Sequence, residues 1–249
     1  MHEISLTWMA LLCAIFLAAG TVKGVTGMGL PTVAMGLLGM AMPPAAAAAL
    51  LVVPSLVTNV WQLLAGPAKA RLVRRLWPMM LGIVAGTVLG AALLVRADPA
   101  RAGLGLGLAL IAYAGYALCA PPLAVPARLE AWLSPWVGAA TGLVTGATGV
   151  LVMPAVPYLQ SLRLDRDELV QALGLSFTVS TVALAAGLAT QGALRVEQLG
   201  WSAFAIAPAL LGMWLGQRIR SRISPALFRR CFLLFLVVLG GELVWRGWR

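Results

Sequence analysis

The stretch GTVKGVTGMGLP, residues 20–31, interrupts an apolar segment near the start of the chain with four glycines, a proline and a lysine. The whole segment covers residues 4–42, which is about twice the ~20 residues that a helix needs to cross a bilayer. Glycine and proline weaken or break helices, and an ionisable side chain at membrane depth is costly. The stretch therefore predicts a helix that is broken inside the membrane, with Lys23 at the break.

The composition of the chain predicts a polytopic membrane protein. Hydrophobic residues make up 61% of the 249 residues and charged residues only 10%, against about 25% charged in a typical soluble domain. The apolar segments cover residues 4–42, 45–65, 77–95, 103–120, 132–160, 168–190, 199–217 and 228–246. Six of these segments have the length of one span, whereas 4–42 and 132–160 are longer and rich in glycine. We therefore expect an all-α protein with several membrane spans.

The charged and reactive residues exclude several classes of function. The net charge of +10 does not indicate nucleic-acid binding, because the basic residues lie in short runs between apolar segments. His2 is the single histidine, and no Asp or Glu falls near the middle of an apolar segment. The three cysteines lie far apart, which fits neither a disulfide framework nor a metal site. We expect no cofactor, no metal and no enzymatic activity.

The two glycine-rich segments resemble one another and divide the chain into two repeats. The second segment reads GAATGLVTGATGV over residues 138–150. With two single-residue gaps, the residues Gly20, Gly24, Thr26, Gly27 and Gly29 align with Gly138, Gly142, Thr145, Gly146 and Gly149. The sequence thus predicts a first membrane repeat over residues 1–120 and a second over 128–249, joined in one integrated membrane domain.

The basic loops predict that the two repeats are inverted. The strongly basic loops are 66–76 in the first repeat and 217–230 in the second, which are not counterpart positions. If both glycine segments are hairpins that enter and leave on one side, the Lys and Arg residues other than Lys23 divide 12 inside to 5 outside. If 4–42 makes two spans, they divide 8 to 9. The first topology is favoured, with a glycine-broken helical hairpin and three transmembrane helices in each repeat.

The polar residues at membrane depth predict an anion-binding site. A broken helix offers main-chain N–H groups and the positive end of its dipole, and paired broken segments mark the binding site in many transporters. Lys23 would attract the anion, because no carboxylate lies at that depth. The predicted substrate-binding residues are Lys23, Gly24, Thr26, Gly27, Gly29, Ser55, Thr58, Gly142, Thr145, Gly146, Thr148, Gly149 and Thr178.

These residue types also have structural roles, which the sequence leaves open. Glycines allow helices to pack closely, and Ser and Thr hydroxyls often bond to a carbonyl of their own helix. A lysine can extend its ammonium group to the membrane interface or pair it with a carbonyl.

The motif KGVTGMG, residues 23–29, followed by apolar residues and Pro31, resembles the first-half signature of the TauE/SafE sulfite-exporter family. The stretch 138–154 resembles the second-half signature, although Val150 and Leu151 stand where the family often has a denser glycine cluster. Pro31 also comes early in the first motif. The resemblance covers essentially the whole chain. It implies a multi-pass permease of the bacterial inner membrane that exports sulfite, sulfonates or related small organic anions.

Together these observations predict a secondary transporter that exports a small anion. Its predicted partners are the anionic substrate and the lipid bilayer, with no nucleic acid, and a homodimer is compatible with the sequence. An anion channel and a non-transporting membrane scaffold are the alternatives. Saturable counterflow in vesicles would distinguish a carrier from a channel.

Overall fold

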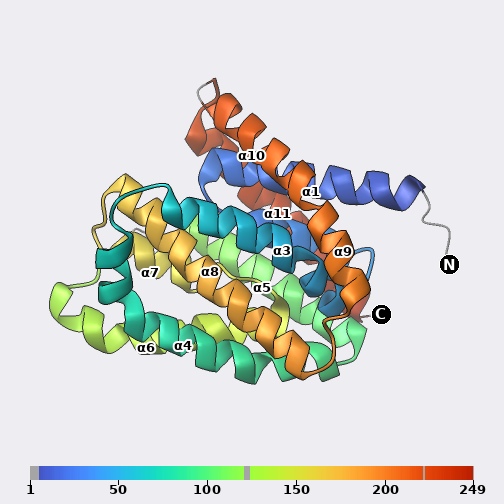
Figure 1. The fold of residues 1–249 in the computed structure, drawn as a ribbon, viewed down its shortest axis with the longest axis horizontal. Coiled ribbons are helices and arrows are strands. Elements are labelled where there is room, and N and C mark those ends of the chain that lie inside the picture. Colours follow the sequence, from blue (N-terminus) through green and yellow to red (C-terminus); the bar gives the residue numbers. More distant parts are fainter. Residues whose placement is uncertain (1–5, 121–123, 221, 249) are drawn as a thin grey trace.

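The computed structural model describes residues 6–120, 124–220 and 222–248, and every regular element in these residues is a helix. The first half contains α1 (Leu6–Thr26), α2 (Leu30–Gly39), α3 (Pro44–Leu64), α4 (Lys69–Arg96) and α5 (Pro99–Cys119). The second half contains α6 (Ala127–Thr148), α7 (Ala155–Ser161), α8 (Arg166–Thr190), α9 (Val196–Phe204), α10 (Ile206–Arg220) and α11 (Pro225–Trp248). The all-α prediction is confirmed for the described residues (Figure 1).

Each half contains a broken helix at its glycine motif. Between α1 and α2 the chain turns at Gly27 and Gly29, whose φ angles of 78° and 100° lie in the left-handed region that favours glycine. Pro31 occupies the first turn of α2, where its missing N–H is tolerated. In the second half α6 ends at Gly149, with a φ of 72°, before the short helix α7. Both predicted breaks are therefore present.

Six described helices are long and apolar enough to cross a membrane, judged by length and composition. These six are Leu6–Thr26, Pro44–Leu64, Lys69–Arg96, Pro99–Cys119, Arg166–Thr190 and Glu197–Arg220, the last of which combines α9 and α10. In the first glycine segment α1 has 21 residues and α2 only 10, so one arm of the expected hairpin has the length of a full span. The chain is thus a multi-pass membrane protein, and the inverted orientation of its halves stays a prediction.

The two halves are interlocked through glycine-lined helix contacts. The helix α6 packs against α4, and α1 packs against α10 (Figure 1). A Cβ atom on Gly142 would lie only 2.2 Å from the carbonyl oxygen of Ile83, and one on Gly24 only 2.2 Å from that of Met213. Small residues let membrane helices approach this closely. The first helix of each half therefore packs against the other half, while α3 packs on α8 and α5 on α11.

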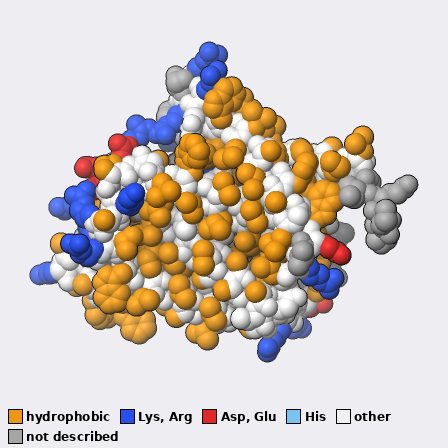
Figure 2. Space-filling model, in the orientation of Figure 1, with side chains coloured by type: hydrophobic (Ala, Val, Ile, Leu, Met, Phe, Trp, Pro, Cys, Tyr) orange, Lys and Arg blue, Asp and Glu red, His pale blue; other side chains and the backbone are white. Residues whose placement is uncertain are grey.

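The surface carries the apolar band that a bilayer requires. Figure 2 shows hydrophobic side chains over the broad central face, with Lys and Arg side chains gathered at the left and upper edges and at the lower right. Trp136, Val88 and Val238 are among the large apolar side chains that the described chain exposes. Such a surface is stable against lipid chains, with charged groups at its two edges.

Candidate functional site

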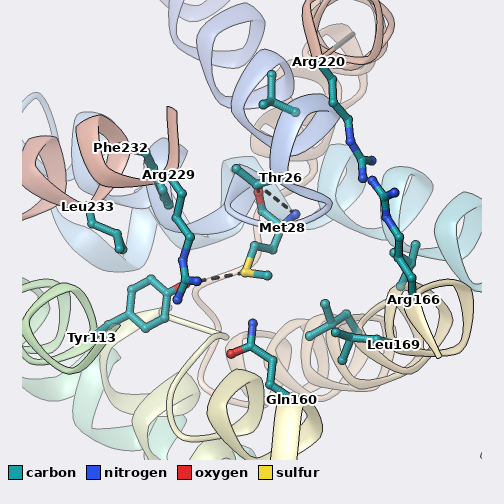
Figure 3. Close-up of a pocket in the computed structure, with 13 residues that line it drawn as sticks. Thr26, Met28, Tyr113, Gln160, Arg166, Leu169, Arg220, Arg229, Phe232 and Leu233 are labelled. Atoms are coloured by element: carbon teal, nitrogen blue, oxygen red, sulfur yellow. Dashed lines mark hydrogen bonds between the residues drawn. The ribbon is translucent and has the colours of Figure 1, made fainter. Parts of the chain in front are cut away.

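A cavity of about 240 Å³ lies beside the break between α1 and α2, and it is named the arginine cavity. Its walls come from the end of α1, the loop that follows it, α5, α7, α8, α10 and α11 (Figure 3). The lining residues are Val25, Thr26, Met28, Tyr113, Gln160, Arg166, Leu169, Val170, Leu173, Arg220, Arg229, Phe232 and Leu233. Segments from both halves of the chain therefore build this cavity.

Three arginines give the arginine cavity its charge. Arg166 is the first residue of α8, Arg220 the last of α10, and Arg229 lies in the first turns of α11. Figure 3 shows the guanidinium groups of Arg166 and Arg220 pointing toward one another. No Asp or Glu is among the described lining residues. Like charges that face one another are unfavourable unless an anion lies between them.

The acidic residues closest in sequence to Arg166 are Asp165, Asp167 and Glu168, all at the N-terminus of α8. Asp165 and Glu168 form a capping box at the N-terminus of that helix, and Glu168 also pairs with Arg71 of α4. On the other side of the cavity, Arg229 donates a hydrogen bond of 3.4 Å to the carbonyl oxygen of Ala117. The guanidinium pair of Arg166 and Arg220 is thus the part of the cavity best placed for an anion.

The remaining wall of the arginine cavity is largely apolar. Phe232, Leu233 and Leu169 line it, and the hydroxyl of Tyr113 donates to the sulfur of Met28 at 3.5 Å. Gln160 points into the cavity between these groups (Figure 3). A small anion with an apolar portion fits this cavity, because its charged group can contact the arginines while its apolar portion contacts the apolar wall.

A second cavity of about 310 Å³ lies beside Lys23 and is named the lysine cavity. Lys23 is only 2% exposed, and its ammonium group donates to the hydroxyl of Thr58 at 3.2 Å and to the side-chain oxygen of Asn59. The other residues that line the lysine cavity are Gly24, Gly27, Trp61, Gln62, Ala65, Val170, Met213, Gln217 and Arg220. Arg220 and Val170 line both cavities. The two cavities are therefore neighbours.

The structure brings a minority of the predicted site residues to these cavities. Lys23, Gly24 and Gly27 line the lysine cavity, Thr26 lines the arginine cavity, and Thr58 contacts Lys23. Apart from Thr58, the predicted residues that line neither cavity are Gly29, Ser55, Gly142, Thr145, Gly146, Thr148, Gly149 and Thr178. The second glycine motif thus contributes no lining residue to either cavity.

The glycines inside helices allow close helix packing, and their role in binding stays a prediction. Gly24, Gly142 and Gly146 lie within α1 and α6, where each N–H bonds to the carbonyl four residues earlier. Gly146 is also pressed against α4, since an added Cβ would lie 2.4 Å from the carbonyl oxygen of Thr87. These three N–H groups are therefore committed to their own helices, and the absence of a side chain serves the contact with α10 or α4.

Four of the N–H groups at the breaks bond within their own turns. Gly27 donates to the carbonyl of Lys23 at 2.8 Å, and Gly149 donates to that of Thr145 at 2.7 Å. The N–H groups of Met28 and Val150 bond to the hydroxyls of Thr26 and Thr148. These four donors are not free for a ligand, whereas α2 begins after Gly29 without a side-chain cap, so the first N–H groups of α2 stay candidates for the predicted anion contact.

The predicted hydroxyl donors mostly bond to main-chain carbonyls. Such bonds are made by Thr26 to Val22 and Met28, Thr58 to Pro54, Thr145 to Val150, Thr148 to Val144 and Thr178 to Gly174. Ser55 differs, because its buried oxygen has no hydrogen-bond partner among the described residues. A hydroxyl has one proton, so these threonines can accept from a neighbour but cannot also donate to an anion.

The hydrogen bonds at the two breaks correct the alignment of the repeats. Thr26 bonds to the carbonyl of Val22 and accepts from the N–H of Met28, and Thr148 makes the same two contacts with Val144 and Val150. The counterpart of Thr26 is therefore Thr148 rather than Thr145. The stretches GTVKGVTG (20–27) and GLVTGATG (142–149) then match without a gap, as G-x-V-x-G-x-T-G.

The cavity arginines were not among the predicted site residues. Arg166, Arg220 and Arg229 all belong to the set that the charge distribution assigns to the inside face, where arginines are expected for topology alone. The available signal was their position, because Arg166 lies just before the apolar segment 168–190, and Arg220 and Arg229 lie in the basic loop 217–230. The start of α8, the end of α10 and the start of α11 come together only in the folded protein.

A family model described as Sulfite exporter TauE/SafE matches residues 12–243, nearly the whole chain. No curated protein and no solved structure matches the sequence. The match includes both glycine breaks and all but the ends of the helical array described above. The chain therefore belongs to the TauE/SafE sulfite exporter family, whose members are membrane transporters and not enzymes.

Proposed function

We propose that this protein is a secondary transporter that exports sulfite, a sulfonate or a related small organic anion across the bacterial inner membrane. The observation that supports this proposal is the facing pair of Arg166 and Arg220, in a cavity whose described lining contains no carboxylate. Guanidinium groups donate forked hydrogen bonds that match the geometry of oxyanions. The pair would hold the anion by its oxygen atoms.

The charge distribution supports transport out of the cell. The arginine cavity is formed by residues that the positive-inside rule assigns to the cytoplasmic face, so it would collect anions from the cytoplasm. A membrane potential that is negative inside favours anion exit by about 2.3 kcal/mol per charge per 100 mV. Export of this kind requires no protonatable group on the protein.

The test is counterflow of radiolabelled sulfite into proteoliposomes loaded with unlabelled sulfite, under anaerobic conditions. We expect saturable uptake with the unchanged protein. Arg166→Gln should lower uptake at subsaturating sulfite about tenfold or more, because a hydrogen bond between charged groups contributes ~1.5–3 kcal/mol. Arg128→Gln removes the same charge from an exposed residue that lines neither cavity, and it should leave uptake unchanged.

Three results would contradict the proposal. Equal uptake by Arg166→Gln and Arg128→Gln would remove the arginine cavity from the transport path. Flux that does not saturate and shows no counterflow would instead favour the anion channel, and no flux beyond that of empty liposomes for any tested anion would favour the scaffold.

A further inference from the structure

We propose that the lysine cavity is a second anion-binding site, in series with the arginine cavity and filled by the same anion. This inference rests on the proposed function, because it assigns a further step of the path to that anion. The ligand is the oxyanion head group, recognised by the ammonium of Lys23 and the guanidinium of Arg220.

The first argument is the isolation of the Lys23 ammonium group. Lys23 is 2% exposed, and both of its partners are neutral side chains. Thr58 donates its own proton to the carbonyl of Pro54, and the Asn59 amide group faces Thr181 at 3.4 Å. The ammonium group has a third proton, and no described Asp or Glu lines its cavity. A buried charge is stable only when it is paired, so an anion in the cavity would supply a counter-charge to the Lys23 ammonium group.

The second argument is the space beside Lys23. The lysine cavity has a volume of about 310 Å³, which exceeds the ~30 Å³ that a water molecule takes in the liquid. Its polar wall includes Gln217 of α10, one helical turn before Arg220. A sulfite-sized anion therefore has room next to two cationic groups.

The third argument is the connection between the two cavities. Arg220 lines both, and its side chain has several rotatable bonds. The loop at the helix break has one cavity on each side, because Gly27 lines the lysine cavity while Thr26 and Met28 line the arginine cavity. An anion bound between Arg166 and Arg220 could thus pass to Lys23 without losing its contact with Arg220.

The loop is held in place by Gln62 of α3. Its amide nitrogen donates to the carbonyl of Gly27 at 2.9 Å and to that of Val170 at 2.8 Å. Both of these residues line the lysine cavity, and Val170 lines the arginine cavity as well. The wall that separates the two anion sites is therefore a glycine turn tied to α3 and α8 by one side chain.

The chain offers a direct test, because Lys23 and Lys69 are its only lysines. Lys69 is exposed at the start of α4 and serves as the internal control. The purified protein is pulsed with acetic anhydride at increasing concentrations of methanesulfonate, and acetylation of each lysine is measured by mass spectrometry. Dimethyl sulfone, which has nearly the same shape without a charge, is the ligand control.

We expect saturating methanesulfonate to slow acetylation of Lys23 at least threefold, with Lys69 unchanged and no effect of dimethyl sulfone. Arg166→Gln should keep this protection at saturation, because the lysine site is separate from the arginine pair. Loss of protection in Arg166→Gln at every concentration would overturn the two-site arrangement. Absence of protection while methanesulfonate still inhibits sulfite counterflow would overturn the lysine site and leave the proposed function intact. If sulfite shows no counterflow and methanesulfonate gives no protection, both proposals fail.

A second measurement does not depend on labelling. Lys23→Gln should slow counterflow at least tenfold, Lys69→Gln should not, and Lys23→Arg should restore part of the rate because it keeps the charge. The folded fraction of each variant is compared by size-exclusion chromatography. Counterflow by folded Lys23→Gln at the rate of the unchanged protein would overturn the proposal.

Discussion

The contact between α4 and α6 makes a quantitative prediction about Gly142→Ala. The added Cβ would lie 2.2 Å from the carbonyl oxygen of Ile83, whereas ordinary contacts begin near 3.4 Å, so the two backbones must separate by more than ~1 Å at this point. Gly138 and Gly146 contact the same helix, and a Cβ on either would lie 2.1 Å or 2.4 Å from a carbonyl oxygen of α4. The separation therefore spreads over three turns of α6.

Overpacking of this kind costs about 1–3 kcal/mol. For a chain of this size, each kcal/mol corresponds to roughly 2–4 °C in the midpoint of thermal unfolding. Alanine also favours the helix over glycine by ~1 kcal/mol, which works in the opposite direction. The control is Gly103→Ala in α5, where the added Cβ would meet nothing within 4 Å and only the gain in helix propensity remains.

The assay is thermal unfolding of both variants in detergent, followed by the loss of folded protein on size-exclusion chromatography. We expect Gly142→Ala to unfold at a midpoint several degrees below that of Gly103→Ala. Because alanine keeps its N–H, the same substitution should leave anion affinity unchanged in the folded fraction. Equal midpoints would refute the packing argument, and a lost affinity at normal stability would restore Gly142 to the binding site.

Three further predictions follow from other contacts. Gln62→Leu should lower the free energy of unfolding by about 1–3 kcal/mol, because the carbonyls of the glycine turn and α8 lose a buried donor; unchanged unfolding would contradict this. A double-mutant cycle on Arg75 and Glu130, which form a two-bond ion pair between α4 and α6, should give a coupling of about 0.5–1 kcal/mol in unfolding, and additive effects would count against it. In a cysteine-free background, single cysteines in 66–76 and 217–230 should react with an impermeant reagent from the same side; labelling from opposite sides rules out the predicted topology.

The architecture could be predicted because the signals that determine it are local. An apolar segment at 45–65 becomes α3 over Pro44–Leu64, since length and hydropathy alone decide whether a segment forms a membrane helix. Positive φ angles at the break are also a local property, because glycine alone adopts them at low cost. Neither inference requires knowledge of which helices touch.

The site was harder to predict because it depends on which helices meet. The four-residue spacing of Gly138, Gly142 and Gly146 recurs in Gly82, Gly86 and Gly90 of α4, and such matched small residues indicate a helix pair. When the second motif is considered without α4, its glycines indicate half of a binding site. The cavity arginines share their sequence context with arginines that only set topology, so only the cavity that they line together in the folded protein distinguishes them.

The crossed pairing of the halves has a consequence for biosynthesis. The face of α1 that carries Gly20 and Gly24 is covered by α10, which is translated only near the end of the chain. At about 5–20 residues per second, α1 waits in the membrane on the order of ten seconds or more for its partner. During that interval residues 1–120 expose two small-residue faces, on α1 and on α4, to lipid or to other nascent helices. The first half therefore has two helix faces that only the second half covers, and separately expressed halves should assemble only when they are made together.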